Sequence, residues 1–117
     1  MTTHGFYSTV LSREGRAMVR ARVREDLEAF LASTGSDADI IETAGSDYPF
    51  RVIVDRDVWA GFLRSEAEGI DYANFKDAVT ARQGRRRHDV YLAVWSALRS
   101  LQVRERPVSH PDGTVAR

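Results

Sequence analysis

The sequence contains no cysteine, which excludes a disulfide framework, a thiolate zinc site, an iron–sulfur cluster and a thiol nucleophile. It has little lysine, because sixteen of its 17 basic residues are arginine and only Lys76 is not. No stretch approaches the roughly 18 apolar residues of a membrane-spanning helix, and the N-terminus lacks the pattern of a signal peptide. We therefore expect a cytoplasmic protein that has no membrane segment and binds no metal or cofactor.

The charged residues balance overall but are unevenly distributed along the chain. Seventeen bases oppose 17 acids in 117 residues, so no net field attracts nucleic acid or an anionic membrane. Residues 1–24 hold five arginines and one acid, whereas residues 25–47 hold seven acids and no base. Residues 85–106 are basic again, with six arginines and two acids. Local electrostatics can therefore matter although the total charge is zero.

Alternation of apolar and polar residues predicts a β-hairpin near the N-terminus. Residues 6–11 are rich in aromatic and β-branched side chains, and residues 13–16 form a polar turn that contains a glycine. Residues 18–24 then alternate strictly, with valine and alanine on one face and Arg20, Arg22 and Arg24 on the other. Such alternation is typical of an antiparallel strand with one buried face.

Helical spacing of apolar residues begins at Glu25 and recurs three times later in the chain. Two strands, at residues 40–41 and 48–54, follow the first helix. Asp55 and Asp71 are the expected N-caps of the second and third helices. The fourth helix covers about residues 87–102. One core is expected to contain residues from three of the four helices: Phe30, Trp59, Phe62, Val94, Trp95 and Leu98.

The predicted element order is β-β-α-β-β-α-α-α. Antiparallel strand pairs followed by helices predict an α+β fold: a two-layer sandwich in which the helices lie mainly on one face of a four-stranded antiparallel sheet. Residues 1–106 form this single domain. Residues 107–117 contain two prolines and a glycine, and we expect them to be a flexible C-terminal tail.

The sequence carries no recognisable catalytic motif. It has no Gly-rich phosphate loop, no HExxH and no GxSxG, and no nucleophile is marked by a neighbouring base. Asp55 and Asp57 together with His88 would be the acids and base of a metal-dependent nuclease. Solvated acids at helix starts explain the same residues more simply, so we predict that the protein is not an enzyme.

Clustered arginines are the main candidate binding residues. If helices cover the valine face of the second strand, Arg20, Arg22 and Arg24 line the open face of the sheet, where Arg51 and either Tyr7 or Thr9 would join them. An open sheet face with arginine and an aromatic residue is a geometry that binds single-stranded nucleic acid. The alternative is a solvated face with cross-strand ion pairs to acids such as Glu42.

A second basic cluster, Arg85, Arg86 and Arg87, precedes the fourth helix. Cations at this place oppose the helix dipole, yet together with the free N–H groups of the first turn they would form an anion site. A solvated turn is the simpler interpretation.

Recurring sequence blocks resemble a family of small uncharacterised proteins encoded by GC-rich bacteria, mainly actinobacteria, and their phages. The likeness lies within residues 4–102 and is carried by residues 4–8, 19–22 with 26–28, 41–43 with 47–48, 70–76 and 91–95. The resemblance implies a cytosolic bacterial or phage protein, in agreement with the arginine bias, and it implies no catalytic residue.

These observations predict a small non-enzymatic binding or regulatory protein that acts through a protein-binding surface and inhibits or regulates a host system. A nucleic-acid-binding module that uses the arginine-lined sheet face is the alternative, and a metal-dependent nuclease is a weaker one. Self-association into a homodimer through a sheet edge is a further hypothesis, because only Pro49 protects that edge.

Overall fold

The computed structural model describes residues 1–105, and the predicted C-terminal tail lies outside this part. The observed element order agrees with the prediction. The strands are β1 (Tyr7–Leu11), β2 (Ala17–Ala21), β3 (Ile41–Glu42) and β4 (Phe50–Val54), and the helices are α1 (Arg24–Thr34), α2 (Arg56–Glu68), α3 (Phe75–Gln83) and α4 (Arg85–Glu105). None of the helices described is long and apolar enough to cross a membrane.

The four strands form one antiparallel sheet in the order β1-β2-β4-β3. A tight turn joins β1 to β2, and Gly15 adopts the left-handed conformation there (φ 74°), which glycine does without steric cost. The register places Val19 between Thr9 and Val52, and both Val19 and Val52 are fully buried. The alternation in β2 therefore predicted the buried face of the sheet correctly.

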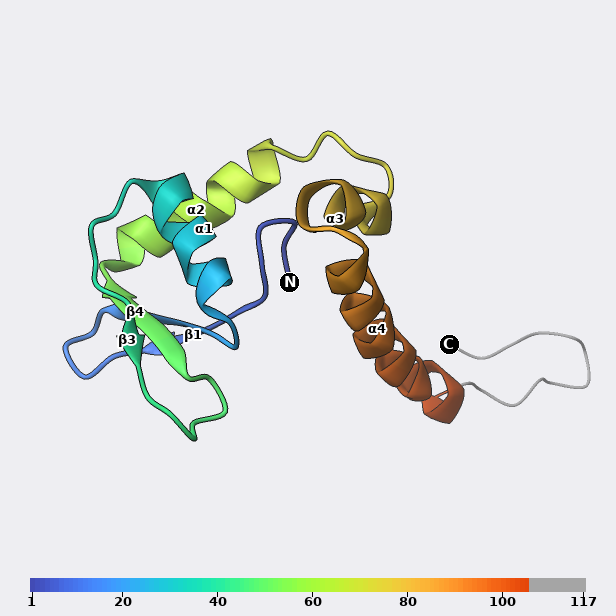
Figure 1. The fold of residues 1–117 in the computed structure, drawn as a ribbon, viewed down its shortest axis with the longest axis horizontal. Coiled ribbons are helices and arrows are strands. Elements are labelled where there is room, and N and C mark those ends of the chain that lie inside the picture. Colours follow the sequence, from blue (N-terminus) through green and yellow to red (C-terminus); the bar gives the residue numbers. More distant parts are fainter. Residues whose placement is uncertain (106–117) are drawn as a thin grey trace, which may run out of the picture.

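Helices α1 and α2 pack on that buried face, and no described helix covers the other one (Figure 1). The core between the two layers contains Leu27 and Phe30 from α1 and Phe62 from α2, all essentially buried. Phe30 and Phe62 meet edge to face, with ring centroids 4.9 Å apart. Together these elements form the sheet lobe, which comprises β1–β4, α1 and α2.

The other two helices form a separate helical hairpin, α3 and α4, which leaves the sheet lobe to one side (Figure 1). Only Gly84 separates them, with φ 92° and ψ 172°, a conformation that is accessible essentially to glycine alone. The ring of Phe75 packs against both Tyr91 and Trp95, at centroid distances of 6.3 and 6.0 Å. Val79 and Tyr91 are buried at this contact.

The prediction of one core shared by the first, second and fourth helices is wrong for α4, because Val94, Trp95 and Leu98 are not part of the core that contains Phe30 and Phe62. Leu98 is 52% exposed, and Val94 and Trp95 are only partly buried. The reason is length, because α3 has 9 residues and α4 has 21. The last turns of α4 therefore extend past the helix that covers its beginning.

The third helix also starts later than predicted. Asn74, not Asp71, is the N-cap of α3, and its side-chain oxygen accepts a hydrogen bond from the backbone N–H of Asp77 (3.1 Å). Asp55 is the N-cap of α2 as predicted, but its carboxylate accepts a hydrogen bond from Arg16 (2.9 Å) and makes no capping bond.

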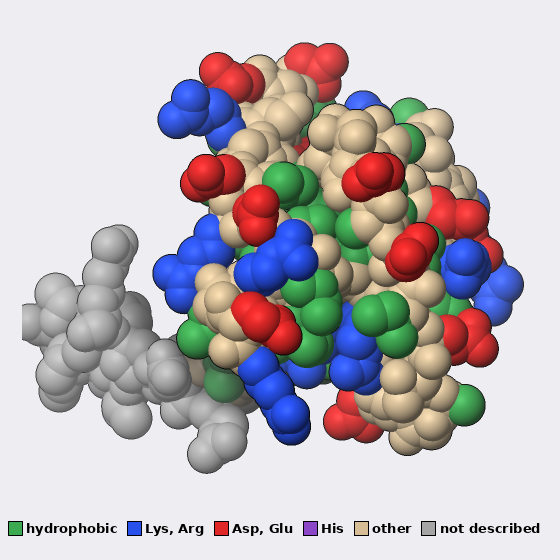
Figure 2. All heavy atoms as spheres, turned by 90° about the vertical axis from the view of Figure 1, so that its left-hand side faces the viewer, with side chains coloured by type: hydrophobic (Ala, Val, Ile, Leu, Met, Phe, Trp, Pro, Cys, Tyr) green, Lys and Arg blue, Asp and Glu red, His purple; other side chains and the backbone are tan. Residues whose placement is uncertain are grey.

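Charges of both signs are mixed at the end of the sheet lobe opposite the helical hairpin. Figure 2 shows this end, with acidic and basic side chains interspersed around a band of hydrophobic ones. Arg16 and Asp55, which form an exposed ion pair, illustrate how opposite charges compensate each other in the sheet lobe. Mixed charges of this kind favour solubility rather than recognition of one partner.

Candidate functional site

Arg20 and Arg51 lie side by side on the uncovered face of the sheet, as the strand alternation predicts. Arg20 donates hydrogen bonds to the hydroxyl and the backbone carbonyl of Ser8 (2.8 and 3.3 Å). Ile41, not Glu42, is the cross-strand neighbour of Arg51. The cross-strand ion pair with Glu42, expected for a merely solvated face, is therefore not formed between the strands described.

The aromatic residue on this face is Tyr48 and not Tyr7. The guanidinium carbons of Arg20 and Arg22 lie 4.7 and 4.5 Å from the centre of the Tyr48 ring, at cation–π distance. The placement of Tyr7 beside the arginines is wrong, because the register pairs it with Ala21 on the buried face. The sequence of β1 does not show which of its side chains are buried, because residues 7–10 do not alternate clearly between apolar and polar.

Tyr7 instead joins the core and the start of α1. Its hydroxyl donates a hydrogen bond to the backbone carbonyl of Asp26 (2.7 Å), and its ring meets Phe62 at 5.4 Å. Burial raises the pKa of the Tyr7 phenol far above its ordinary value, and the negative charge of Asp26 raises it further.

Four more predicted binding residues, Arg24 and Arg85–Arg87, lie apart from the sheet face. The prediction of Arg24 on a strand is wrong, because β2 ends at Ala21 and Arg24 is the first residue of α1, 3.9 Å from Glu28. Arg85, Arg86 and Arg87 form the first turn of α4 and do not precede it. Arg85 is paired with Asp89 one turn later (3.2 Å).

The structure brings Arg22, Arg86 and Arg87 together at one groove, which lies between the sheet lobe and α4. The groove has a volume of about 610 Å³. Its apolar lining comes from the segment before β1, from the β2–α1 connection and from α4: Phe6, Val23, Val90, Tyr91 and Val94. Its acidic lining residues are Glu25 and Asp26. We call it the α4 groove.

A buried ion pair forms one wall of the α4 groove. Asp26 is 3% exposed, and its carboxylate lies 2.9 Å from Arg87 and also accepts the backbone N–H of Phe6 (3.0 Å). Burial lowers the pKa of Arg87, but the Tyr91 hydroxyl and the Asp26 charge outweigh it and leave the pKa above its ordinary value. Gly5 packs so closely that a Cβ there would lie 2.6 Å from the Asp26 carboxyl carbon. The wall is therefore fixed, and the charge of Asp26 is neutralised.

The rim of the α4 groove carries the other two arginines. Arg22 donates a hydrogen bond to the backbone carbonyl of Asp47 (2.8 Å), a neutral partner. The side chain of Arg86 makes no hydrogen bond or ion pair to any residue in the range 1–105. Below them, Val90 is 53% exposed although it faces the groove. Exposed apolar side chains beneath two cations that face a single acid, Glu25, are a surface that a complementary partner would cover.

Sequence reasoning missed the apolar half of this groove. Phe6 was placed in a strand and Val23 on the buried face, and Val90 was not placed on the apolar stripe of the fourth helix. The spacing did hold a signal, because Val90 lies one turn before Val94 on the same side of the helix. That signal becomes visible only once α3 is known to cover the other side, at Tyr91 and Trp95.

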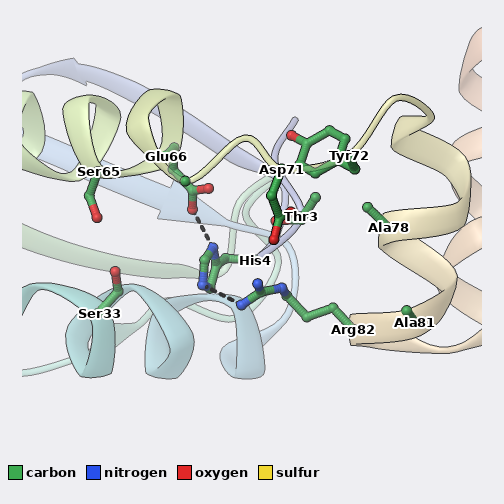
Figure 3. Close-up of a pocket in the computed structure, with 11 residues that line it drawn as sticks. Thr3, His4, Ser33, Ser65, Glu66, Asp71, Tyr72, Ala78, Ala81 and Arg82 are labelled. Atoms are coloured by element: carbon green, nitrogen blue, oxygen red, sulfur yellow. Dashed lines mark hydrogen bonds and ion pairs between the residues drawn. The ribbon is translucent and has the colours of Figure 1, made fainter.

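A second, polar cavity of about 650 Å³ lies where the N-terminal segment meets α1, α2 and α3 (Figure 3). His4 occupies its centre, with Nδ1 in contact with the Glu66 carboxylate and Nε2 2.9 Å from the Arg82 guanidinium. Because a guanidinium can only donate, Nε2 is the acceptor in the contact with Arg82. His4 thereby ties the N-terminal segment to both α2 and α3, a role that its place near the chain end did not suggest.

The residues of the nuclease hypothesis are not assembled into a metal site. Asp55 and Asp57 lie at the start of α2, where Asp55 is paired with Arg16. His88 lies near the start of α4, with Nδ1 3.0 Å from Asp89. Within residues 1–105, no three histidine or acidic side chains are grouped so that they could hold a metal ion.

Comparisons of the chain with protein families, with curated proteins and with solved structures found no match. The assignment of a function therefore depends on the geometry of the α4 groove and of the sheet face.

Proposed function

We propose that the chain is a small non-enzymatic binding protein of the cytoplasm that regulates or inhibits a partner protein by docking a segment of it in the α4 groove. The observation that carries this proposal is the convergence of Arg22, Arg86 and Arg87 over an apolar floor that is partly exposed. Three of the eight arginines and tyrosines predicted to bind a partner meet there, although they come from distant parts of the sequence.

The composition of the α4 groove supports a protein partner. Arginine, tyrosine and apolar side chains surrounding a fixed wall are typical of the centres of protein interfaces. The buried pair of Asp26 and Arg87 supplies the rigid side, so little conformational entropy is lost there on binding. Val90 and Val23, exposed by 53% and 37%, supply apolar area that a partner can remove from water.

Nucleic acid remains the second candidate, on the strength of a different surface. Arg20 and Arg51 are neighbours on the uncovered sheet face, and neither is paired with an acid among the residues described. However, the one tyrosine of this face already lies beneath two guanidinium groups, which leaves less of its ring for stacking on a base.

Affinity capture from a lysate of the source organism, with and without nuclease, separates the two candidates. We compare the unaltered chain with Val90→Glu, which places a charge in the α4 groove, and with Leu63→Glu, which places one on an exposed leucine of α2. A protein partner in stoichiometric amount should survive nuclease, be lost with Val90→Glu and be retained with Leu63→Glu.

Two results would overturn this function. Loss of all co-purifying protein after nuclease, together with loss of binding in Arg20→Glu/Arg51→Glu, would assign the nucleic-acid role to the sheet face. Equal capture by Val90→Glu and Leu63→Glu would show that the α4 groove is not the binding site.

A further inference from the structure

The exposed apolar side chains of the α4 groove continue along α4 as a regular seam. Val90, Val94, Ala97 and Leu101 are spaced by four, three and four residues, so they lie on one side of the helix. Val90 and Leu101 are each just over half exposed. Three helical turns separate them, about 17 Å along the axis.

The shape of this seam selects the conformation of its occupant. The 4-3-4 spacing is the one by which two helices pack side by side, whereas an extended strand needs a free strand edge. The far part of α4 extends from the body of the molecule (Figure 1), so an approaching helix meets no described element beside Leu101. A helix is therefore the occupant that the surface fits.

The charges at one end of the seam select the chemistry of that helix. Three arginines and two acids line the groove, and Asp26 already neutralises Arg87. Arg22 and Arg86 then face Glu25 alone, so the end of the seam near the start of α4 is positive. A partner with acidic side chains at that end gains complementary charge at the rim, which favours fast and specific association.

A second copy of this chain is the wrong partner for the same reason. Residues 85–102 of α4 contain four arginines and a single acid, Asp89, which is already paired with Arg85. Two such helices laid against each other bring like charges together, at a cost to the complex.

We propose that the α4 groove and its seam bind an amphipathic helix of a partner protein, apolar along one side and acidic at the end that lies beside Arg22 and Arg86. The proposal rests on the function proposed above and adds the kind of partner. The apolar side of the partner helix covers the seam from Val90 to Leu101, and the acidic side chains of that helix pair with Arg22 and Arg86.

Selection from a displayed library of helical peptides, with every surface position randomised, tests the proposal on the full chain. Peptides that bind the unaltered chain should be enriched in apolar residues at 3–4 spacing and in acids at one end. Reversing both rim charges, in Arg22→Glu/Arg86→Glu, should weaken the enriched peptides about tenfold, the effect of two exposed ion pairs. The control Arg64→Glu/Arg99→Glu changes net charge equally on exposed residues outside the groove and should leave their affinity unchanged.

The possible failures are distinguishable. Enriched peptides that are insensitive to Val90→Glu would mean that the α4 groove is not the docking site, and the proposed function would fail with the inference. Two results would overturn the acidic helix and leave the proposed function standing. In the first, the peptides require Val90 but carry no excess of acids. In the second, they bind Arg22→Glu/Arg86→Glu as well as they bind Arg64→Glu/Arg99→Glu. Dimerisation of the unaltered chain in sedimentation, lost with Val90→Glu, would make a second copy the occupant instead.

Discussion

The sheet lobe encloses its apolar residues between two layers, whereas the helical hairpin leaves half of its apolar stripe in solvent. In the lobe, Phe62 and Leu27 are buried between helices and sheet. In the hairpin, α3 covers only the beginning of α4, and Leu98 and Leu101 stay exposed. The lobe is thus stabilised by its own core, and the hairpin has apolar surface left for a partner.

The contact between these two regions differs from the interior of either. It is largely polar: Arg87 pairs with Asp26, Gln83 donates a hydrogen bond to the carbonyl of Thr3 (2.6 Å), and Arg82 contacts His4. Polar contacts of this kind resemble those between domains, which permit relative movement more readily than an apolar core does. The α4 groove lies along this contact, so the width of the groove depends on the position of the hairpin relative to the sheet lobe.

The largest effect is expected in the core of the lobe. Phe62→Ala should lower the free energy of unfolding by about 4 kcal/mol, because it removes a buried aromatic ring and leaves a cavity. Urea unfolding followed by circular dichroism measures the loss. The neighbouring Leu63 is 45% exposed, and Leu63→Ala should cost below about 1 kcal/mol. Equal costs would mean that the core of the lobe is not where the structure puts it.

The next largest loss of stability is expected at the contact between the sheet lobe and the helical hairpin. Arg87→Met should cost about 3 kcal/mol, because it leaves the Asp26 carboxylate buried without its cation. Adding Asp26→Asn to that variant removes the unpaired charge and should restore part of the loss. Hydrogen exchange should show faster exchange in α3 and α4 than in the sheet. A uniform increase over the whole chain would argue that lobe and hairpin form one cooperative unit.

A smaller loss is expected inside the hairpin. Trp95→Ala should cost about 2 kcal/mol, below the value for a fully buried aromatic, because Trp95 is only partly covered by Phe75 and Lys76. Leu98→Ala, three residues further along α4, should change stability by less than about 1 kcal/mol. A loss for Trp95→Ala as large as that for Phe62→Ala would restore the single shared core predicted from sequence.

The smallest effect concerns alkaline pH and the lobe. The pKa of Tyr7 is raised in the folded chain by burial, so near pH 10.5 the unfolded chain loses this proton while the folded chain keeps it. Stability is therefore complete below about pH 10 and falls as the pH rises further. Between pH 8 and 10.5, unaltered protein should lose about 0.5 kcal/mol more than Tyr7→Phe. Identical losses, measured by urea unfolding, would place Tyr7 in solvent.

Local sequence patterns predicted most of the fold. Strict alternation in β2 identified its buried face, and Asp55 marked the start of α2. Apolar periodicity found α4 but could not tell whether a partner helix covers each turn, because the same pattern suits a core and an unoccupied seam. The end of α4 is exposed because α3 is short, running only from its N-cap Asn74 to its C-cap Gly84.

The candidate site was predicted only in its charges. The sequence singled out Arg22, Arg86 and Arg87 but assigned them to two surfaces, since nothing local indicates that residues some 60 positions apart meet. Tyr7 was assigned to the wrong face, because β1 carries no clear alternation of its own. The role of His4 could not be predicted, because its partners Glu66 and Arg82 come from two different helices whose positions the sequence does not give.

The backbone conformation of Gly84 sets the direction of α4. The connection between α3 and α4 has no second residue to absorb a change, so the aim of α4 depends on two backbone angles at this one position. A helix of 21 residues is about 32 Å long, and a 10° turn at its base displaces its tip by about 5 Å. A single substitution at Gly84 would change the direction of α4 without altering any of the α4 residues that line the groove.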